Sequence, residues 1–350
     1  MARPPSRRGW RGPLLALAVL AAAGAAAWAR PAFTPPLSLT GDGRGVAVLQ
    51  PVMLGGIQQW ITIRGEDRTA PVVLMLLGEP GQAQIAWARA ATRPLEDGFV
   101  VVQWDRQGAG KSFAPGQDPA FLRTSREVDD AAELIGLLRK RLGARRVIVV
   151  GQGYGAYLGV ALARAHPELV QAYVGVGQTA CSPDDERAIQ DSWLKQRAEA
   201  ANDPEVFTRA AAGGAWDRAR AVFRYGGAIG GAHSDSALSL APLVAPEYSL
   251  GEALTAHDGA AVTSAGFTRD GPDLPLARSV PALEVPAFFF IGGGDYLAPG
   301  LCAERYAAAL KAPLKHVVWF ARSAHYPFME EPGRFRAELL GAAYATEDRR

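Results

Sequence analysis

Two hydrophobic patterns alternate along most of the chain. Short apolar or alternating runs bounded by Gly and Pro predict strands, and longer segments with apolar residues three and four positions apart predict helices. Strands are expected at residues 46–52, 57–65, 72–77, 99–104, 147–150 and 173–176, within 285–295, and at 316–320. Helices are expected at residues 85–95, 125–142, from about 154 to 166, at 303–310 and from 333 onward.

Strands that are separated by helices indicate a mostly parallel sheet covered by helices on both faces. Residues 178–282 depart from this alternation, because they are rich in Ala, Gly and charge and carry weaker strand signals. The sequence therefore predicts an α/β core formed by residues 46–177 and 283–345, with residues 178–282 inserted as a helical lid.

The N-terminus contains a segment of a different kind. Arg3, Arg7, Arg8 and Arg11 precede an uncharged apolar run from Pro13 to Ala29, which is close to the lower length limit for a membrane span. Residues 1–29 are therefore expected to be either a membrane anchor or a cleaved signal peptide, and both would export the body across the inner membrane. The body would then be membrane-anchored, periplasmic or secreted, with residues 30–45 as a Pro-containing linker.

Charge and composition narrow the function. The formal net charge of +2 falls to −2 without the four N-terminal arginines, so the body has no basic surplus and we expect no nucleic-acid partner. The only two cysteines, Cys181 and Cys302, can form one disulfide or none. We favour two buried thiols and keep a disulfide as the alternative.

The stretch VIVVGQGYGAYLG, residues 147–159, joins a predicted strand to a predicted helix through three glycines. Its G-x-G-x-x-A pattern resembles a dinucleotide-binding loop, which requires an acidic residue about 20 positions later. Residues 173–178, YVGVGQ, contain none, and several predicted strands already precede the loop. A phosphate-binding loop ending at Gly110-Lys111-Ser112 is excluded as well, because Asp105 stands where its first glycine is needed. We expect no cofactor and no metal.

The same stretch fits the strand-to-helix corner that presents a nucleophile in hydrolases. In such a corner the central residue carries the nucleophile, and the flanking glycines allow the neighbouring backbones to approach. The central residue here is Gly153. Asp295 follows a later apolar strand and His325 follows the last one, so the chain order is corner, acid, histidine. In that arrangement Asp295 would orient His325, and His325 would act as the base.

Four ordered motifs make residues 46–340 resemble the α/β-hydrolase fold, and within it the prolyl-aminopeptidase-like branch. They are LGEPG at 77–81, DRQGAGKS at 105–112, GGGDYLAP at 292–299 and SAHYPFMEEP at 323–332. The resemblance implies an amide- or ester-hydrolysing serine hydrolase whose lid binds the amine of the substrate. It also implies an oxyanion hole made by the backbone N–H groups of Glu79 and Tyr154.

The chain departs from this branch at its reactive positions. Gly153 replaces the serine, Leu77 replaces the loop histidine, and Glu79 replaces a glycine of the oxyanion loop. The order of Arg106 and Gln107 is also exchanged. Without a side-chain nucleophile no acyl-enzyme can form at position 153, and a Glu79 carboxylate turned into the hole would oppose a developing oxyanion.

Three hypotheses follow. The first is a non-catalytic or impaired homologue that binds a small molecule or short peptide under its lid and contacts the membrane through its N-terminal segment. The second is an active hydrolase in which His325 activates a water molecule, and the third is an engineered Ser→Gly form of an active enzyme. Candidate lid residues for a substrate amine are Glu186, Glu199, Glu247 and Glu252.

Overall fold

The computed structural model describes residues 13, 15–19, 24–25, 31–37, 43–118, 121–267, 270 and 275–347 of the chain. These residues form an eight-stranded sheet with the order β1-β2-β4-β3-β5-β6-β7-β8. Its strands are β1 Val46–Leu54, β2 Ile57–Gly65, β3 Val72–Leu76, β4 Val100–Asp105, β5 Val147–Gly153, β6 Val170–Gln178, β7 Ala287–Gly292 and β8 Lys315–Phe320. Only β1 with β2 and β2 with β4 pair antiparallel, so the prediction of a mostly parallel sheet is confirmed.

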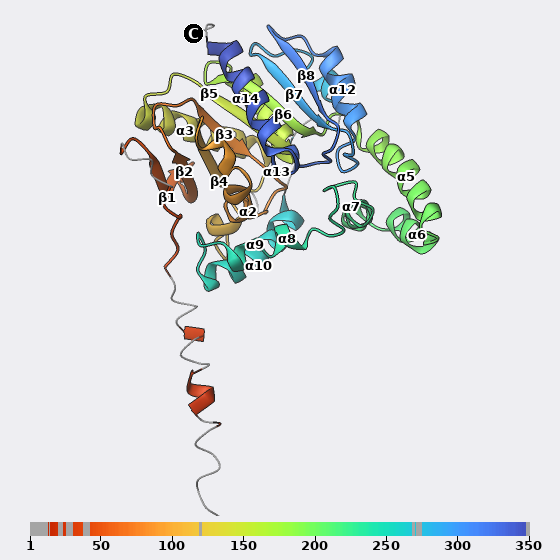
Figure 1. Cartoon of the computed structure of the whole chain (residues 1–350), viewed down its shortest axis with the longest axis horizontal. Coiled ribbons are helices and arrows are strands. Elements are labelled where there is room, and N and C mark those ends of the chain that lie inside the picture. The colour runs from red at the N-terminus through yellow and green to blue at the C-terminus, as the bar shows by residue number, and fades with distance from the viewer. Residues whose placement is uncertain are drawn as a thin grey trace, which may run out of the picture.

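Helices cover both faces of this sheet (Figure 1). Those of the core are α2 Gln84–Ala91, α3 Thr124–Leu142, α4 Tyr154–Ala165, α12 Gly300–Ala309, α13 Pro327–Glu330 and α14 Pro332–Glu347, with short 3₁₀ turns η1 Arg93–Leu95 and η2 Gly110–Ser112. Between β6 and β7 the chain forms α5 Pro183–Ala200, α6 Pro204–Ala212, α7 Ala215–Arg224, α8 Ser236–Ser239, α9 Ala241–Val244, α10 Leu250–Gly266 and α11 Leu276–Ser279. We call this segment between Gln178 and Ala287 the insertion.

The continuous apolar strands reflect burial on both sides. Leu74 and Val149 pack with α3, α4 and α12 in one buried cluster. Their neighbours Val73 and Val150 pack with α2 and α14 in another, which also extends into the insertion. Successive side chains of a strand point to opposite faces, so a strand between two helical layers has no polar side to alternate with.

Strand β5 lies in the middle of the sheet, between β3 and β6, and leads directly into α4. The preceding helix α3 ends at Gly143, which adopts a left-handed conformation with φ 70°, as the glycine stop in the sequence predicts. Because α3 stops there, the chain turns back and β5 enters the sheet with its apolar residues fully buried.

Two ion pairs tie the insertion to the core. Arg89 of α2 contacts Glu247 at 2.6 Å, and Lys111 of η2 contacts Glu252 at 2.5 Å. The Glu247 carboxylate is completely buried. Losing Arg89 would leave the buried Glu247 charge uncompensated, so this contact restricts where the insertion can sit.

Cys181 and Cys302 form a disulfide, so the expectation of two buried thiols is wrong. Cys181 follows β6 and Cys302 lies in α12, and the fold brings their Cα atoms to 5.3 Å, within bonding range. The two residues are 121 positions apart in the sequence, so only the tertiary arrangement could reveal the pairing. The bond joins the beginning of the insertion to the core.

Most of residues 1–29, the expected anchor or signal peptide, lie outside the described residues. Among the residues that are described, no helix has both the length and the apolar character needed to span a bilayer. Residues 31–37 of the expected linker run along the body, where the Phe33 amide donates to the Pro246 carbonyl at 2.9 Å.

Replacing both Cys181 and Cys302 by Ser should destabilise the protein. The bond closes a loop of 121 residues, and its loss is expected to lower the free energy of unfolding by about 3–5 kcal/mol, because the unfolded chain gains conformational freedom. Urea unfolding followed by circular dichroism measures the difference. A reducing agent should lower the stability of the unmodified protein and leave the double variant unchanged; equal stability of the two proteins would contradict the prediction.

Candidate active site

A sharp corner joins β5 to α4 at Gly153, whose φ and ψ are 62° and −125°. A positive φ of this kind is strained for most residues and places position 153 at the tip of the turn. The flanking glycines are required by close packing: a Cβ on Gly155 would lie 1.9 Å from the Leu76 carbonyl oxygen, and one on Gly151 would lie 2.4 Å from the Gly155 carbonyl oxygen. The helix can therefore start against β3 only where a side chain is absent.

Asp295 and His325 meet beside this corner. His325 Nδ1 lies 2.8 Å from Asp295 Oδ2, and both side chains are buried. The second carboxylate oxygen of Asp295 accepts the amide hydrogens of Leu297 at 3.0 Å and Ala298 at 2.9 Å. The carboxylate is thus held from two sides, and it orients the imidazole so that Nε2 faces the corner.

Gly177, near the end of β6, is a site residue that sequence reasoning missed. A Cβ there would lie 2.5 Å from His325 Nδ1 and Cε1 and 3.1 Å from Asp295 Oδ2. Its positive φ of 50° also favours glycine. The signal was present in the YVGVGQ stretch, but nothing in the sequence indicated which later residues would pack against it.

A side chain at position 153 would lie against the histidine. A Cβ on Gly153 would lie 3.2 Å from His325 Nε2 and 3.4 Å from Glu79 Oε1. The corner therefore aims position 153 at the base, as in a serine hydrolase. The corner also aims position 153 at the Glu79 carboxylate, which an attacking serine would have to displace.

Glu79 turns its carboxylate toward the corner while the residue remains exposed to solvent. Its Oε1 accepts the Tyr154 amide hydrogen at 3.4 Å, and its own amide donates to Gln82 Oε1 at 3.3 Å. The neighbouring Gly78 amide donates to Gln152 Oε1 at 3.0 Å. The backbone donors around the expected oxyanion hole thus have partners within the protein, and one of these partners is an anion.

Arg106 holds the loop that carries Glu79. Its guanidinium donates to the carbonyl oxygens of Leu77 at 3.0 Å, Gly78 at 3.2 Å and Glu79 at 3.0 Å. On its other side it pairs with the buried Glu127 at 3.1 Å. The Arg-Gln order at 106–107 therefore places the cation under the oxyanion loop, where it fixes the backbone of residue 79.

Charges around His325 favour its protonated form. Burial lowers the pKa of the imidazole, but Asp295, Glu79 and Glu330 together raise it above its ordinary value of 6.5. The native protein therefore binds this proton more tightly than the unfolded chain does. A raised pKa weakens His325 as a base near neutral pH, because a larger fraction of the imidazole is already protonated.

The two tyrosines near the corner, Tyr154 and Tyr326, are not activated as nucleophiles. The Tyr154 hydroxyl lies 3.1 Å from Thr124 Oγ1 and donates to Glu127 Oε2 at 2.9 Å. Burial and the Glu127 charge hold the pKa of Tyr154 well above its ordinary value. Burial, Glu79 and Asp295 also raise the pKa of Tyr326, whose ring packs edge-on against His325. Neither phenol is activated toward its nucleophilic phenolate form.

Of the four candidate lid carboxylates, Glu247 and Glu252 form the two ion pairs with the core, and Glu252 also caps α10. Glu186 accepts the Ala180 amide hydrogen at 3.1 Å, and Glu199 is exposed near the end of α5. The structure therefore shows structural partners for three of the candidates, and it places a different carboxylate, Glu79, beside His325.

The insertion touches both loops of the Asp-His pair. The Tyr296 amide donates to the Gly227 carbonyl, and the His325 amide donates to the Ala228 carbonyl, both at 2.8 Å. The ring of Trp193 in α5 stacks on Tyr296 with centroids 4.3 Å apart. Any movement of the insertion would therefore disturb the loops that carry Asp295 and His325.

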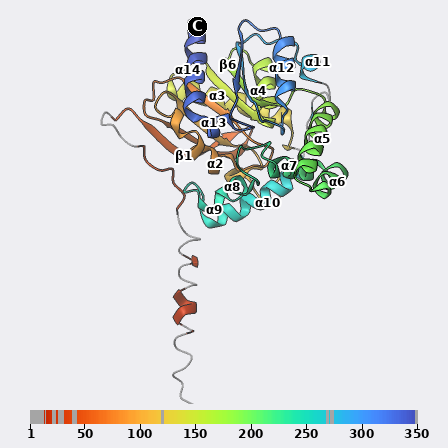
Figure 2. The same cartoon turned by 45° about the vertical axis from the view of Figure 1, so that its right-hand side comes forward.

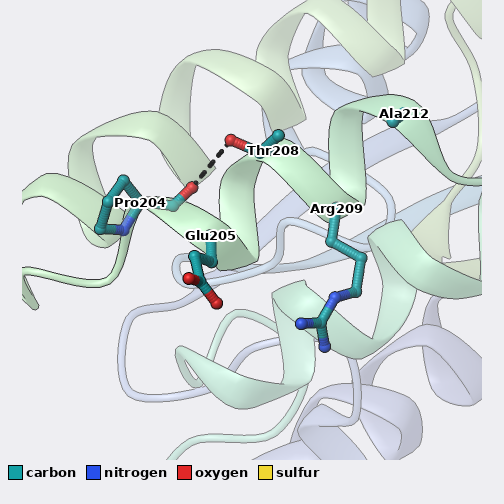
Figure 3. Close-up of a pocket in the computed structure, with 5 residues that line it drawn as sticks. All are labelled: Pro204, Glu205, Thr208, Arg209 and Ala212. Atoms are coloured by element: carbon teal, nitrogen blue, oxygen red, sulfur yellow. Dashed lines mark hydrogen bonds between the residues drawn. The ribbon is translucent and has the colours of Figure 1, made fainter.

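Other surface features are separate from this site. Figure 3 shows an open hollow on α6, lined by Pro204, Glu205, Thr208, Arg209 and Ala212, at the end of the insertion that Figures 1 and 2 both place farthest from the sheet. Within the part of the chain that the structure describes, no three His, Cys, Asp or Glu side chains are grouped to hold a metal ion.

Comparisons with known proteins identify the family of the chain. Residues 71–332 match the family described as "alpha/beta hydrolase fold". The chain is 25% identical over 308 residues to "Probable aminopeptidase YbaC" of Bacillus subtilis (strain 168), covering 85% of this chain and 96% of that protein. It is also 25% identical over 120 residues, 34% of this chain and 40% of the relative, to a proline iminopeptidase of Lactobacillus helveticus.

Among solved structures, the proline iminopeptidase of Mycobacterium smegmatis aligns with a TM-score of 0.60 at 18% identity, covering 85% of this chain and 98% of that one. At this identity the alignment shows a common fold. It does not compare the chemistry at position 153.

Replacing Glu79 by Gln is expected to lower the pKa of His325, because one of the negative charges that raise it is removed. Asp295→Asn should lower it further, since Asp295 also loses its charged hydrogen bond to the ring. NMR titration of the imidazole signals measures both shifts.

The raised pKa of His325 also makes the folding stability depend on pH. A raised native pKa contributes stability that is complete below about pH 6.5 and is lost as the pH rises through the native pKa. Glu79→Gln should therefore remove part of that contribution on the acidic side. Glu199→Gln, an exposed change on α5, serves as the control, and an unaltered His325 pKa in Glu79→Gln would show that this carboxylate does not face the ring.

Proposed function

The chain belongs to the alpha/beta hydrolase fold family, and we propose that it is a member without acyl-transfer activity that binds a small molecule or short peptide beneath the insertion. The observation that carries this proposal is the hydrogen bond from the Tyr154 amide to Glu79 Oε1. It combines with the absence of a nucleophile at Gly153 to remove two separate requirements of the serine hydrolase mechanism.

The first requirement is a covalent nucleophile. Gly153 has no side chain, and Tyr154, the next residue, directs its hydroxyl to Thr124 and Glu127. The second requirement is a set of donors aimed at the oxyanion. Here a carboxylate accepts from the Tyr154 amide, so a developing oxyanion would meet a negative charge instead of a free donor.

A ligand with a positive charge suits the remaining site best. Glu79 is an exposed carboxylate whose hydrogen bond to Tyr154 is long, at 3.4 Å, so a stronger donor can compete for it. Asp295 adds a second negative charge behind His325. The relatives named as an aminopeptidase and an iminopeptidase are named for action at an amino end, and we propose that this chain binds an amine at Glu79 without cleaving the adjoining bond.

A second candidate function is hydrolysis by an activated water, which the intact Asp295–His325 pair favours. The place of the absent Cβ is 3.2 Å from His325 Nε2 and 3.4 Å from Glu79 Oε1, distances that suit a hydrogen-bonded water. His325 would take a proton from this water as its oxygen attacks an ester or amide carbonyl, and it would return the proton to the leaving group. Loss of one triad member elsewhere leaves roughly 10³–10⁴-fold catalysis over water, but that remainder depends on an open oxyanion hole.

We also propose that the body works outside the cytoplasm. The uncharged run from Pro13 to Ala29 follows four arginines, a pattern typical of export. The Cys181–Cys302 disulfide supports the proposal, because such bonds persist in oxidising compartments. A mass measurement on the mature protein distinguishes a retained anchor from a cleaved signal peptide.

Activity assays separate the two candidate functions. With p-nitrophenyl acetate and aminoacyl p-nitroanilides, the unmodified protein should remain at background. Gly153→Ser alone should restore little hydrolysis, because Glu79 still occupies the oxyanion hole. Gly153→Ser combined with Glu79→Gly should hydrolyse the substrates at least about 10²-fold faster than the single variant, which is the effect of a working oxyanion donor. Adding His325→Ala to this double variant is the control and should abolish the gain. Turnover by the unmodified protein that His325→Ala removes would instead support the activated-water reaction.

Binding of L-prolinamide tests the ligand class. Isothermal titration calorimetry should detect binding to the unmodified protein. In Glu79→Gln the affinity should fall about tenfold or more, because a charge-assisted hydrogen bond of about 1.5–3 kcal/mol is lost. N-acetyl-L-prolinamide, which has no cationic amine, should not bind. Glu199→Gln is the matched change at an exposed carboxylate of α5. Equal binding of the acetylated compound, or loss of binding only in Glu199→Gln, would contradict the assignment to Glu79.

A further inference from the structure

Helices α8 and α9 expose an uncharged apolar surface. The exposed residues there are Ser236, Ala237, Ser239, Leu240, Leu243 and Val244, and we call this surface the α8–α9 face. Leu240 is 56% exposed, Leu243 46% and Val244 79%. The only charged residue between Ser236 and Leu250 is Glu247, which is buried and paired with Arg89.

The exposed apolar residues of this face are additional to the apolar residues that α8 and α9 bury. Leu238, Ala241 and Ala245 are buried and belong to the core cluster, so the same short segment already supplies its share of the core. The additional leucines and valine point to solvent with no charged residue among them. Three large apolar side chains exposed on one short segment are typical of an interaction site.

The N-terminal chain leaves the body beside this face. The Phe33 amide donates to the Pro246 carbonyl at 2.9 Å, and the Thr34 hydroxyl donates to Glu247 Oε1 at 3.3 Å. Pro246 and Glu247 lie two and three positions beyond Val244, the last residue of α9.

The distance along the chain then limits where the N-terminal apolar run can be. Only four peptide steps separate Ala29, the end of the run, from Phe33, and four extended residues span at most about 14 Å. If the run from Pro13 to Ala29 lies in a bilayer, the α8–α9 face is held close to the surface of that bilayer.

We propose that the α8–α9 face rests on the lipid bilayer, with Leu240, Leu243 and Val244 inserted at the interface. The proposal rests on the proposed export with a retained N-terminal anchor. A lipid surface fits better than a second protein copy, because the tether delivers this face to the membrane in every molecule. The residues of the face are themselves uncharged, and the Asp235 carboxylate at its edge accepts from Ser239 Oγ at 3.2 Å, so the contact with lipid is expected to come from the apolar side chains. Since the insertion contacts the Asp295 and His325 loops through Gly227 and Ala228, the site would lie behind a surface that faces the membrane.

Depth-dependent quenching tests the contact in the full-length protein. The natural cysteines are paired, so Val244→Cys introduces one free thiol for the fluorophore NBD, and Leu240→Cys repeats the measurement. The protein is reconstituted into phosphatidylcholine vesicles with and without doxyl-labelled lipid. NBD at 244 and 240 should shift to shorter wavelength and lose emission when doxyl lipid is present. Tyr344→Cys is the matched control: Tyr344 is 69% exposed, and it lies on α14, at the opposite end of the molecule from α9. Its label should not respond.

A label at Leu17→Cys, within the apolar run, distinguishes the possible failures. Quenching at 17 without quenching at 244 would overturn the proposal while leaving the anchor intact. No quenching at 17 would overturn it by removing the anchor on which it rests. Disulfide-linked dimers of unlabelled Val244→Cys without lipid would overturn it in favour of a second copy. None of these outcomes affects the prolinamide titration, so the proposed ligand binding stands or falls separately.

Discussion

The approach of α4 to β3 is the constraint on which the site depends. Gly155 lies so near the Leu76 carbonyl that a single Cβ would overlap it. This contact lets β5 turn into α4 within one residue, and it leaves Gly153 at the tip of the corner with a positive φ. The Tyr154 amide at the start of α4 then points to the space beside His325. Close packing of the backbone thus produces the sharp geometry of this corner.

Acidic side chains dominate the electrostatics of the site. In a serine hydrolase one buried carboxylate faces the histidine, and neutral donors face the substrate oxygen. Here Glu79 adds a second carboxylate on the substrate side, and the Arg106 guanidinium holds the backbone that presents it. The negative charges of Asp295, Glu79 and Glu330 together raise the pKa of His325. The Glu79 carboxylate that accepts from the Tyr154 amide therefore distinguishes this site from that of a serine hydrolase.

The insertion is held by several kinds of contact that depend on one another. The Cys181–Cys302 bond fixes its beginning, the ion pairs of Glu247 and Glu252 fix its second half, and its 227–228 backbone is bonded to the Asp295 and His325 loops. Since Glu247 also accepts from Thr34 of the N-terminal linker, the linker, the insertion and the core meet at one buried carboxylate. A surface contact on α8 or α9 would therefore act on elements that connect directly to the site.

The amino-acid sequence by itself determined the α/β architecture, since hydrophobic periodicity and glycine spacing are local properties. Strands β1 and β2, the Gly143 stop and the corner at Gly153 were all predictable from short segments, and so was the order of corner, Asp295 and His325. The sequence also raised the question of Glu79 but left open which way its side chain turns. Only the tertiary structure decided the rest: the pairing of Cys181 with Cys302, the need for Gly177 behind His325, and the contact of Glu79 with the Tyr154 amide. Each of these joins residues from separate parts of the chain, and no local pattern records the distance between them.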